Sequence, residues 1–370
     1  MKNICFLNSI EFWGGGEKLH LQNAIEFRKL NYRVTLLAKP KSPLWQKAHG
    51  ANIPTYPIRI RNLSFLNPFK VIHLATRLYR LKIDTVVFSS SQDLKTGSLA
   101  AYLAGVQRVV YLRGLAVPIK NSLINRVIFK YFLTTIITNS EDTKTNILKH
   151  LGKYIAAEKI KTVYHGVDPN RVNRDPHGRL DSIQEKGRGV ILGNAGRLTK
   201  QKEQEKLIEI AKILKEQGVD YTLFIAGCGE RRSDLQQLIE KYDLQNHVFM
   251  LGFVSEMEKF MNSIDVFLLT SKWEGFGFVL VEAMIKSKPV VAFDISSNPE
   301  IIDHEKSGYL VDYPDLQLFA QKTAQLIQNS ALRNRMGQHG SRIVHARFLL
   351  HDRIKEIENL LERTSNTLCI

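Results

Sequence analysis

Cysteine is scarce in this chain of 370 residues. The three cysteines, Cys5, Cys228 and Cys369, lie far apart and form no C-x-x-C pair. Neither a disulfide framework nor a cysteine-based zinc site is therefore indicated. Such sparse cysteine use fits a reducing compartment, and we expect the protein to be cytoplasmic.

Long hydrophobic runs are missing as well. No segment reaches the roughly 20 apolar residues that a membrane-spanning helix needs. The first apolar run, Ile4 to Leu7, is shorter than the roughly 7–15 residues of a signal-peptide core. We interpret it as a β-strand. With 44% hydrophobic and 24% charged residues, the chain has the composition of a soluble globular protein.

Acidic residues are few in the first half of the chain. Residues 1–175 hold 27 Lys and Arg against 10 Asp and Glu, a net charge of +17, whereas residues 176–370 hold 25 against 26, a net charge of −1. This asymmetry indicates an anionic partner for the first half, such as a membrane surface, a phosphorylated acceptor or nucleic acid. A generally basic proteome is the simpler explanation, but it would raise the charge of both halves.

Short apolar runs alternate with helix-like stretches along the first half. Strands are predicted at residues 4–8, 32–38, 85–89, 109–112 and 135–138, and helices at 17–30 and 96–104. Strands separated by helices predict βαβ units and a parallel sheet. The polar stretch that follows Asp168 lacks periodicity and carries Pro169 and Pro176. We therefore expect a first domain at 1–168 and a linker at 169–188.

The same alternation restarts after the linker. Strands are predicted at 189–195, 221–226, 248–251, 266–270 and 290–292, and helices at 203–217, 235–242, 279–286, 316–329 and 350–363. We expect a second α/β domain at 189–348. Two Rossmann-like halves predict a cleft between the carboxyl ends of their strands, because ligands of open α/β sheets bind there.

The sharpest local signal lies between Val266 and Met284. An apolar strand is followed by a loop with Gly275 and Gly277, and then by a helix opening near Phe278. Free backbone N–H groups at such a helix start bind anions, and glycine lets a diphosphate approach the backbone closely.

Two carboxylates flank this predicted helix start. Glu274 projects from the loop, and Glu282 lies eight residues further on, between Val281 and Ala283. Carboxylates there suit the hydroxyls of a sugar or a ribose as hydrogen-bond acceptors. The alternative reading makes Glu274 an ordinary loop residue and Glu282 a solvated helix residue. The apolar neighbours of Glu282 argue against a purely solvent-exposed side chain.

The stretch from Ser271 to Met284 resembles the E-x7-E signature of glycosyltransferase family 4, whose members have the GT-B fold. Further segments resemble the family in the same order along the chain: Gly196-Arg197-Leu198 with Gln201-Lys202, Ala226-Gly227-Cys228-Gly229-Glu230, Pro289-Val290-Val291-Ala292, Pro299-Glu300-Ile301-Ile302 and Ser307-Gly308-Tyr309-Leu310-Val311. The N-terminal half resembles it mainly through Gly14-Gly15-Gly16-Glu17 and Thr138-Asn139-Ser140-Glu141.

The resemblance implies a function and a site. It implies an α/β protein of the GT-B type, two Rossmann-like domains facing each other across a cleft, that transfers sugar from a nucleotide-sugar donor, with a UDP-sugar favoured. Glu282 would bind the ribose, Glu274 the transferred sugar, and Arg197 with Lys202 the leaving diphosphate. Further donor-binding candidates are Gly15, Gly16, Gly227, Gly275, Phe276 and Gly277. It also implies that a C-terminal helix at about 349–370 packs back on the first domain.

The mechanism follows partly from the residues and partly from the resemblance. No Asp-x-Asp pair and no His/Asp cluster with metal-ligand spacing occurs in the sequence. Arg197 and Lys202 can neutralise a leaving diphosphate in place of a magnesium ion. We therefore expect no metal and no other cofactor. The resemblance adds retention of the anomeric configuration without an enzymic nucleophile.

Two positions depart from the pattern of the family. Arg113, followed by Gly114, stands where many relatives carry a histidine close to the reacting sugar. Arg113 is thus a candidate for the acceptor site or reaction centre, where it could meet a phosphate or an acidic sugar, and a surface arginine at a strand end is the alternative. His165 stands where relatives usually have asparagine, and we expect it to be structural.

The acceptor side is indicated by a basic amphipathic segment at residues 120–132. Leu123, Val127 and Tyr131 share one helix face, and Ile124, Ile128 and Phe132 share another. Such a helix can lie in a membrane interface, with residues 58–63 adding to that surface. A helix packed on the sheet with its cations exposed is the alternative. The membrane reading predicts peripheral association with the inner face of the cytoplasmic membrane.

The predicted acceptor is a glycan growing on a lipid, such as lipopolysaccharide core or another surface polysaccharide precursor. Two other functions stay open from sequence: a degenerate GT-B module that only binds a nucleotide sugar, and a GT-B enzyme of another type, such as an epimerase or a phosphorylase. No nucleic-acid-binding module is recognisable, so nucleic acid is not expected as a partner.

Overall fold

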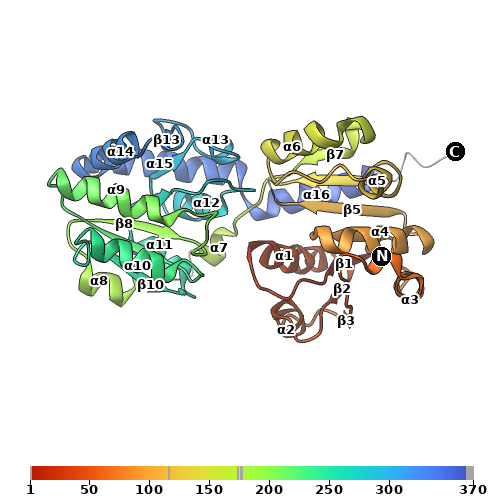
Figure 1. Cartoon of the computed structure of the whole chain (residues 1–370). Helices are drawn as coiled ribbons and strands as arrows, with labels where there is room; N and C mark the ends of the chain where they lie inside the picture. The colour runs from red at the N-terminus through yellow and green to blue at the C-terminus, as the bar shows by residue number, and fades with distance from the viewer. Residues whose placement is uncertain (1, 116, 173–174, 176–177, 364–370) are drawn as a thin grey trace. The chain divides into compact units, whose positions relative to one another are not determined.

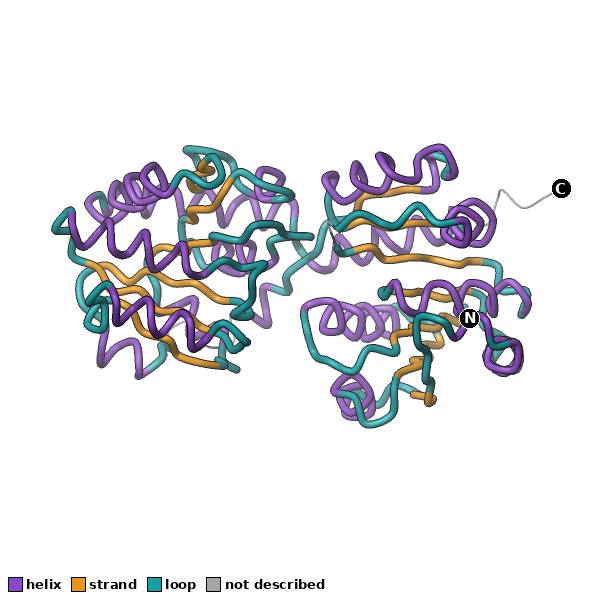
Figure 2. Tube along the Cα trace, in the orientation of Figure 1, coloured by secondary structure: helices purple, strands orange, loops and turns teal. Residues whose placement is uncertain are grey.

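The computed structural model describes residues 2–115, 117–172, 175 and 178–363. The chain divides into two compact units, Met1–Tyr164 with Arg353–Ile370, and His165–Asp352 (Figure 1). In each unit helices cover a sheet of parallel strands (Figure 2). The prediction of an α/β protein with two Rossmann-like domains is confirmed.

The first unit is a seven-stranded parallel sheet in the order β3-β2-β1-β4-β5-β6-β7. Its strands are β1 (Asn3–Asn8), β2 (Arg33–Ala38), β3 (Thr55–Pro57), β4 (Thr85–Phe88), β5 (Arg108–Arg113), β6 (Thr135–Thr138) and β7 (Ile160–Thr162). Its helices are α1 (Gly15–Lys29), α2 (Pro43–Gly50), α3 (Pro68–Arg80), α4 (Ser91–Leu103), α5 (Leu123–Val127) and α6 (Glu141–Leu151), with the short turns η1 (Ser64–Leu66), η2 (Ile128–Phe132), η3 (Gly152–Tyr154) and η4 (Ala157–Lys159).

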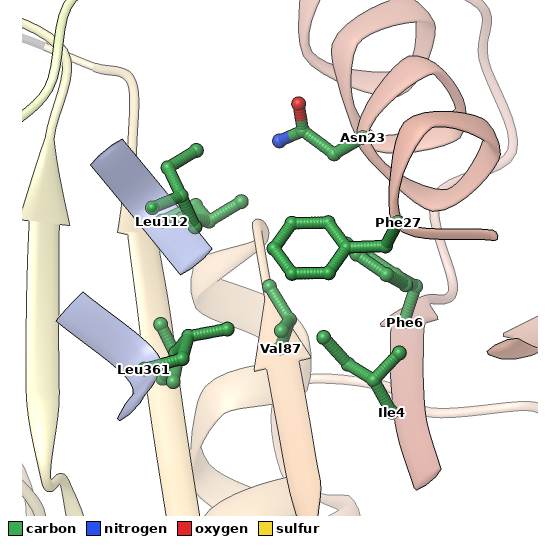
Figure 3. Close-up of a pocket in the computed structure, with 9 residues that line it drawn as sticks. Ile4, Phe6, Asn23, Phe27, Val87, Leu112 and Leu361 are labelled. Atoms are coloured by element: carbon green, nitrogen blue, oxygen red, sulfur yellow. The ribbon is translucent and has the colours of Figure 1, made fainter. Parts of the chain in front are cut away.

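Alternate residues of β1 face opposite sides of this sheet, as the period of a strand requires. Cys5 and Leu7 belong to the core formed with α3 and α4. Ile4 and Phe6 face the other side, where they line a small apolar cavity together with Phe27 of α1 (Figure 3). Leu361 of α16 (Leu350–Arg363) closes the same cavity and is buried. The last helix therefore packs on the first sheet through its C-terminal part.

The second unit is a six-stranded parallel sheet in the order β10-β9-β8-β11-β12-β13. Its strands are β8 (Val190–Ala195), β9 (Tyr221–Ala226), β10 (Val248–Gly252), β11 (Val266–Leu269), β12 (Val290–Phe293) and β13 (Gly308–Val311). Its helices are α7 (Pro169–Val172), α8 (Asp181–Lys186), α9 (Gln204–Glu216), α10 (Arg232–Lys241), α11 (Met257–Ser263), α12 (Phe278–Ile285), α13 (Asn298–Ile301), α14 (Leu316–Gln328) and α15 (Ser330–Arg347).

Chain order reverses once within each sheet, and this fixes where a ligand can bind. In the first sheet β1 lies between β2 and β4, and in the second β8 lies between β9 and β11. At such a switch point the loops after the two adjacent strands turn to opposite faces and leave a crevice at their carboxyl ends. The fold therefore predicts ligand-binding sites at the loops after β1 and β4 and at those after β8 and β11.

The boundary between the units lies four residues earlier than the sequence predicts, after Tyr164 instead of Asp168. The expected linker at 169–188 falls inside the second unit and contains α7 and α8. Val167 donates its backbone N–H to Phe348 O at 2.8 Å, and Leu350 donates to Val167 O at 2.9 Å. These bonds tie the start of the second unit to its last residues. Residues 173–174, 176–177 and 364–370 of the expected linker and last helix lie outside the described residues.

Candidate functional site

The predicted donor residues of the second unit gather at its switch point. Residues 196–203 connect β8 to α9, and residues 270–277 connect β11 to α12. The two connections are joined by hydrogen bonds: Lys272 N donates to Gln201 O at 2.8 Å, and Gln201 Nε2 donates to Trp273 O at 2.9 Å. Two loops that are about 70 residues apart in sequence thus form one continuous edge.

Lys202 and Glu274 form an ion pair across these two loops. Lys202 Nζ lies 2.5 Å from Glu274 Oε1, and the two side chains are only 18% and 7% exposed. Ser271 Oγ donates to the same oxygen at 2.6 Å. Since both bonds go to Oε1, the carboxylate is held in one orientation. Its Oε2 accepts no hydrogen bond from the residues that the structure describes and can accept one from a ligand hydroxyl.

Arg197 differs from Lys202 in that its side chain is exposed. Within the described part of the chain its guanidinium has no ion pair or hydrogen bond, while its backbone oxygen accepts from Gln204 Nε2 at 3.0 Å. Gln204 begins α9, so Arg197 is anchored next to that helix start while its charge stays available. The sequence predicts that cations here require a compensating anion. Glu274 fills that role for Lys202.

Glu203 was missed by sequence reasoning. It is the N-cap of α9 with φ of 44°, in the left-handed region that few residues other than glycine adopt. Its carboxylate accepts hydrogen bonds from Tyr313 Oη at 3.1 and 3.2 Å, and its backbone oxygen accepts from Thr270 Oγ1 at 3.1 Å. These bonds hold the turn that presents Lys202. A left-handed glutamate gives no sequence signal that could have found it.

Gly227 permits a close approach of two loops. Its φ is 147°, and a Cβ at this position would lie 1.8 Å from Gly196 O. Backbone bonds from Gly196 N to Ala226 O at 2.9 Å and from Leu198 N to Cys228 O at 3.0 Å hold the loops together. The predicted donor-binding glycine thus has a packing reason of its own, because it fixes the loop that carries Arg197.

The start of α12 is packed too closely for a side chain at its N-cap. Gly277 is its N-cap, where a Cβ would lie 2.8 Å from Leu280 Cδ1 and 3.1 Å from Asn298 Oδ1. Asn298 is fully buried and donates to Phe293 O at 2.9 Å. Its Oδ1 is buried without a hydrogen-bond partner among the described residues. Gly275 lies in the same loop, and Glu282 is the fifth residue of α12 and partly exposed.

Phe276 lies in this loop but packs inward. Its side chain is 6% exposed and makes edge-on contacts with His165 and Phe348 at centroid distances of 5.3 and 5.7 Å. Burial lowers the pKa of His165 to about 4, so the imidazole is neutral at pH 7. The predicted structural role of His165 agrees with this packing. Any contribution of Phe276 to donor binding must come from its backbone.

In the first unit, the predicted glycines lie at the start of α1, where the switch-point loop after β1 ends. Gly15 and Gly16 are the first two residues of α1, with Gly14 as the N-cap. A Cβ at Gly15 or Gly16 would meet no atom of the described residues within 4 Å. Protein packing therefore does not require glycine here. The exposed start of this 15-residue helix leaves its backbone N–H groups open to a ligand.

A buried carboxyl group fixes the neighbouring loop. Asp93 of α4 is 0% exposed and accepts hydrogen bonds from Ser9 N at 2.9 Å, from Ser9 Oγ and from Ser90 Oγ at 2.7 Å. Burial raises the pKa of Asp93 to about 6, although these hydrogen bonds act in the opposite direction. Asp93 carries no distinctive sequence signal, since a lone aspartate early in a helix is ordinary.

Asp93 predicts a pH dependence of stability. Because its pKa rises from 3.8 to about 6 on folding, the folded state binds the proton more tightly. The protonated Asp93 therefore adds on the order of 3 kcal/mol to the free energy of unfolding. This stabilisation is fully present below about pH 4 and is lost as the pH rises through 6. We expect Asp93→Asn to flatten the pH dependence of the unfolding free energy between pH 4 and 7, measured by urea denaturation. A wild-type slope in that variant would contradict the assignment.

Arg113 lies at the carboxyl end of β5 and is buried, at 5% exposed. Its guanidinium donates to Ser91 Oγ at 3.1 Å, to Tyr111 Oη at 3.2 Å and to Val117 O at 2.5 Å. The alternative of a surface arginine is therefore wrong, because the strand continues into a loop that folds over the side chain. The bonds tie that loop to the start of α4. A direct role at the reaction centre stays a prediction.

The predicted amphipathic helix at 120–132 divides into α5 and the π-helical turn η2. Leu123 and Tyr131 on one predicted face are 76% and 63% exposed, whereas Ile128 and Phe129 are buried in the core. One face thus packs on the sheet, as the alternative reading required, and an apolar face remains outside. No helix in the described part of the chain is long and apolar enough to cross a membrane.

Comparison with known proteins gives two family matches. The model "Glycosyl transferases group 1" matches residues 180–342, and the model "Glycosyltransferase Family 4" matches residues 13–171. The first match lies within the second unit, and the second match covers most of the first unit and the first seven residues of the second. Both predicted halves are thus recognised independently.

Full-length relatives and solved structures agree. The chain is 25% identical to the UDP-Gal:alpha-D-GlcNAc-diphosphoundecaprenol alpha-1,3-galactosyltransferase of Escherichia coli, over 96% of each chain. It is 25% identical to the capsular polysaccharide biosynthesis glycosyltransferase CapM of Staphylococcus aureus, over 92% of each. The structure of Alr3699/HepE from Anabaena, in complex with UDP and glucose, shares 22% identity with a TM-score of 0.83, over 98% of this chain and 100% of that one. The chain therefore belongs to glycosyltransferase family 4 and has the GT-B fold.

Proposed function

We propose that this glycosyltransferase moves a sugar from a UDP-sugar to a lipid-linked glycan, with retention of configuration and without a metal. The observation that carries the proposal is the largely buried Lys202–Glu274 pair at the switch point, with the exposed Arg197 on the same loop as Lys202. The pair keeps an ammonium and a carboxylate ready in one place. Arrival of a sugar diphosphate lets Lys202 meet phosphate oxygens and Glu274 meet sugar hydroxyls.

The chemistry of this site favours the departure of a diphosphate. As the bond between the anomeric carbon and the phosphate oxygen breaks, negative charge grows on the diphosphate, and Arg197 and Lys202 stabilise that charge. The acceptor hydroxyl forms the new bond to the anomeric carbon on the same face, and its proton passes to the leaving phosphate oxygen. Glu274 is bound to Lys202 and Ser271 and serves as a donor ligand rather than a nucleophile.

The relatives support the donor and the acceptor class. The name of the Escherichia coli enzyme states a UDP-galactose donor and a diphosphoundecaprenol-linked acceptor, and the Anabaena structure contains UDP. In this chain the +17 charge of residues 1–175 and the exposed apolar face of α5 and η2 suit an anionic membrane surface that presents such an acceptor. We place the protein in the cytoplasm, at the inner face of the membrane.

Donor binding tests the proposal most directly. Calorimetry with UDP-, GDP- and ADP-sugars in the presence of chelator should show selective binding of a UDP-sugar. Arg197→Ala should weaken it roughly 10- to 100-fold, as the loss of one charge-assisted hydrogen bond predicts. Lys212→Ala is the matched control, because Lys212 is a partly exposed cation of α9 that lies outside the loop of residues 196–203 and contacts Glu216 at 3.5 Å and the ring of Tyr242.

Two outcomes would redirect the proposal. Folded protein that binds no donor in chelator but binds after magnesium is restored would contradict metal independence. Binding of a UDP-sugar that is converted to an epimer with no acceptor present would favour the epimerase alternative. NMR coupling constants of the anomeric proton in the product test retention independently.

A further inference from the structure

One long stretch of the first unit contains basic residues but no acidic ones. Between Phe27 and Ile83 the sequence holds twelve Lys and Arg and no Asp or Glu. This stretch forms β2, α2, β3, η1 and α3. Any carboxylate that neutralises its cations must come from elsewhere, as Glu11 does for Lys39. The stretch therefore presents a positive surface with no acidic residue of its own.

A groove of about 660 Å³ opens within this stretch. It is lined by the ends of β2 and β3 and by the first turns of α3, with Thr96 as its one lining residue from outside the stretch. The basic side chains around it are Arg59, Lys70, His73 and Arg77, and none of the described residues that line it is acidic. A concave site with converging cations fits a phosphate-bearing ligand.

The cations divide into one that is fixed and two that are available. Arg77 donates to Pro57 O at 2.5 Å and lies 3.1 Å from His73 Nε2, so its guanidinium is held in the groove. The side chains of Arg59 and Lys70 are exposed and make no ion pair or hydrogen bond with any residue that the structure describes. A ligand can recruit both without breaking a protein contact.

Helix α3 adds an apolar surface beside these cations. Its buried face carries Val71, Leu74, Ala75 and Leu78. A second face exposes Phe69, Ile72 and Tyr79 at 81%, 55% and 72%, and Leu63 and Leu66 just before the helix are 68% and 67% exposed. Helical spacing puts Lys70, His73 and Arg77 between these two faces. Exposed apolar residues next to a basic groove suit a ligand with an anionic head and a hydrocarbon chain.

We propose that this groove binds the phosphate group of the lipid-linked acceptor, with Arg59, Lys70 and Arg77 around the phosphate and with Leu66, Phe69 and Ile72 along the lipid chain. The inference rests on the proposed function for the identity of the ligand. The groove lies at the carboxyl ends of β2 and β3, the same edge of the sheet at which β1 leads to Gly15 and Gly16. A head group held there extends its sugar along the edge where open α/β sheets bind their ligands.

Farnesyl diphosphate is a soluble probe that carries both chemical features. We expect full-length protein to bind it in calorimetry without any donor, and Arg59→Glu/Lys70→Glu to weaken binding at least tenfold. Arg80→Glu on the same helix is the control, because Arg80 is exposed and lies outside the groove. Phe69→Ser should weaken farnesyl diphosphate and leave inorganic diphosphate unchanged. Equal binding of the two diphosphates by the parent protein would overturn the apolar part of the proposal.

The donor assay separates this inference from the proposed function. UDP-sugar affinity should be the same in the groove variants and the parent, whereas the acceptor KM in a transfer assay should rise at least tenfold with little change in kcat. Transfer to a lipid acceptor that is unaffected by Arg59→Glu/Lys70→Glu would overturn the groove and leave the function standing. If the parent protein bound farnesyl diphosphate but no sugar nucleotide, the proposed function would be overturned and the groove would stand as a binding site for a lipid diphosphate. Binding to phosphatidylglycerol vesicles gives a further test. If groove and control variants lost vesicle binding equally, and the parent did not bind farnesyl diphosphate, the proposal would be overturned, because the basic stretch would then act only through its overall charge.

Discussion

Glu274→Gln is expected to lower kcat/KM for sugar transfer by roughly 100-fold, which corresponds to about 2.7 kcal/mol. The change removes a charged acceptor for a sugar hydroxyl and leaves Lys202, only 18% exposed, opposite a neutral amide. Hydrogen bonds to charged groups are worth about 1.5–3 kcal/mol, and loss of the negative charge also changes how Lys202 meets the diphosphate. Steady-state kinetics with the preferred donor measure the effect.

The same substitution should also cost stability, and a double variant separates the two effects. Leaving a largely buried ammonium without its partner destabilises by about 3 kcal/mol at most here, since Lys202 keeps some solvent contact. Lys202→Met/Glu274→Gln removes both charges and should recover most of the unfolding free energy. Activity should remain at or below that of the single variant. Recovery of activity together with stability would mean that the pair is only structural.

Gly227→Ala should destabilise the second unit by about 3 kcal/mol or more. The new Cβ would lie 1.8 Å from Gly196 O, and a φ of 147° is strained for any residue with a side chain. The loop after β8 must move to relieve the overlap, and Arg197 moves with it. We therefore expect UDP-sugar affinity to fall along with stability, measured by chemical denaturation and by calorimetry on the folded fraction.

Gly218 provides the matched control for this prediction. It also has positive φ, 68°, but a Cβ there would meet nothing within 4 Å. Gly218→Ala should therefore cost only about 1 kcal/mol for the left-handed backbone and leave donor affinity unchanged. If both alanine variants lost the same free energy, the close approach of the loops at Gly196 and Gly227 would not be what requires glycine.

The sequence already contained the local features of the donor site. The apolar run before Thr270, the glycines at 275 and 277 and the helix that carries Glu282 depend only on neighbouring residues, and they lie in the structure where the pattern predicts them. The βα alternation likewise predicted two parallel sheets. Short edge strands such as β3 and β7, three residues each, were missed because they are too short for a periodic signal.

The pairing of these features was decided by the tertiary structure. Lys202 and Glu274 are 72 positions apart and meet because β8 and β11 are neighbours in the sheet although β9 and β10 intervene in the chain. The left-handed turn at Glu203 is held by Tyr313, and the guanidinium of Arg113 is bound by Ser91, and neither partner belongs to the local segment. A local sequence pattern indicates which helix, strand or loop one segment can form. Which loops come together depends on strand order, and that is fixed only when the whole sheet packs its helices.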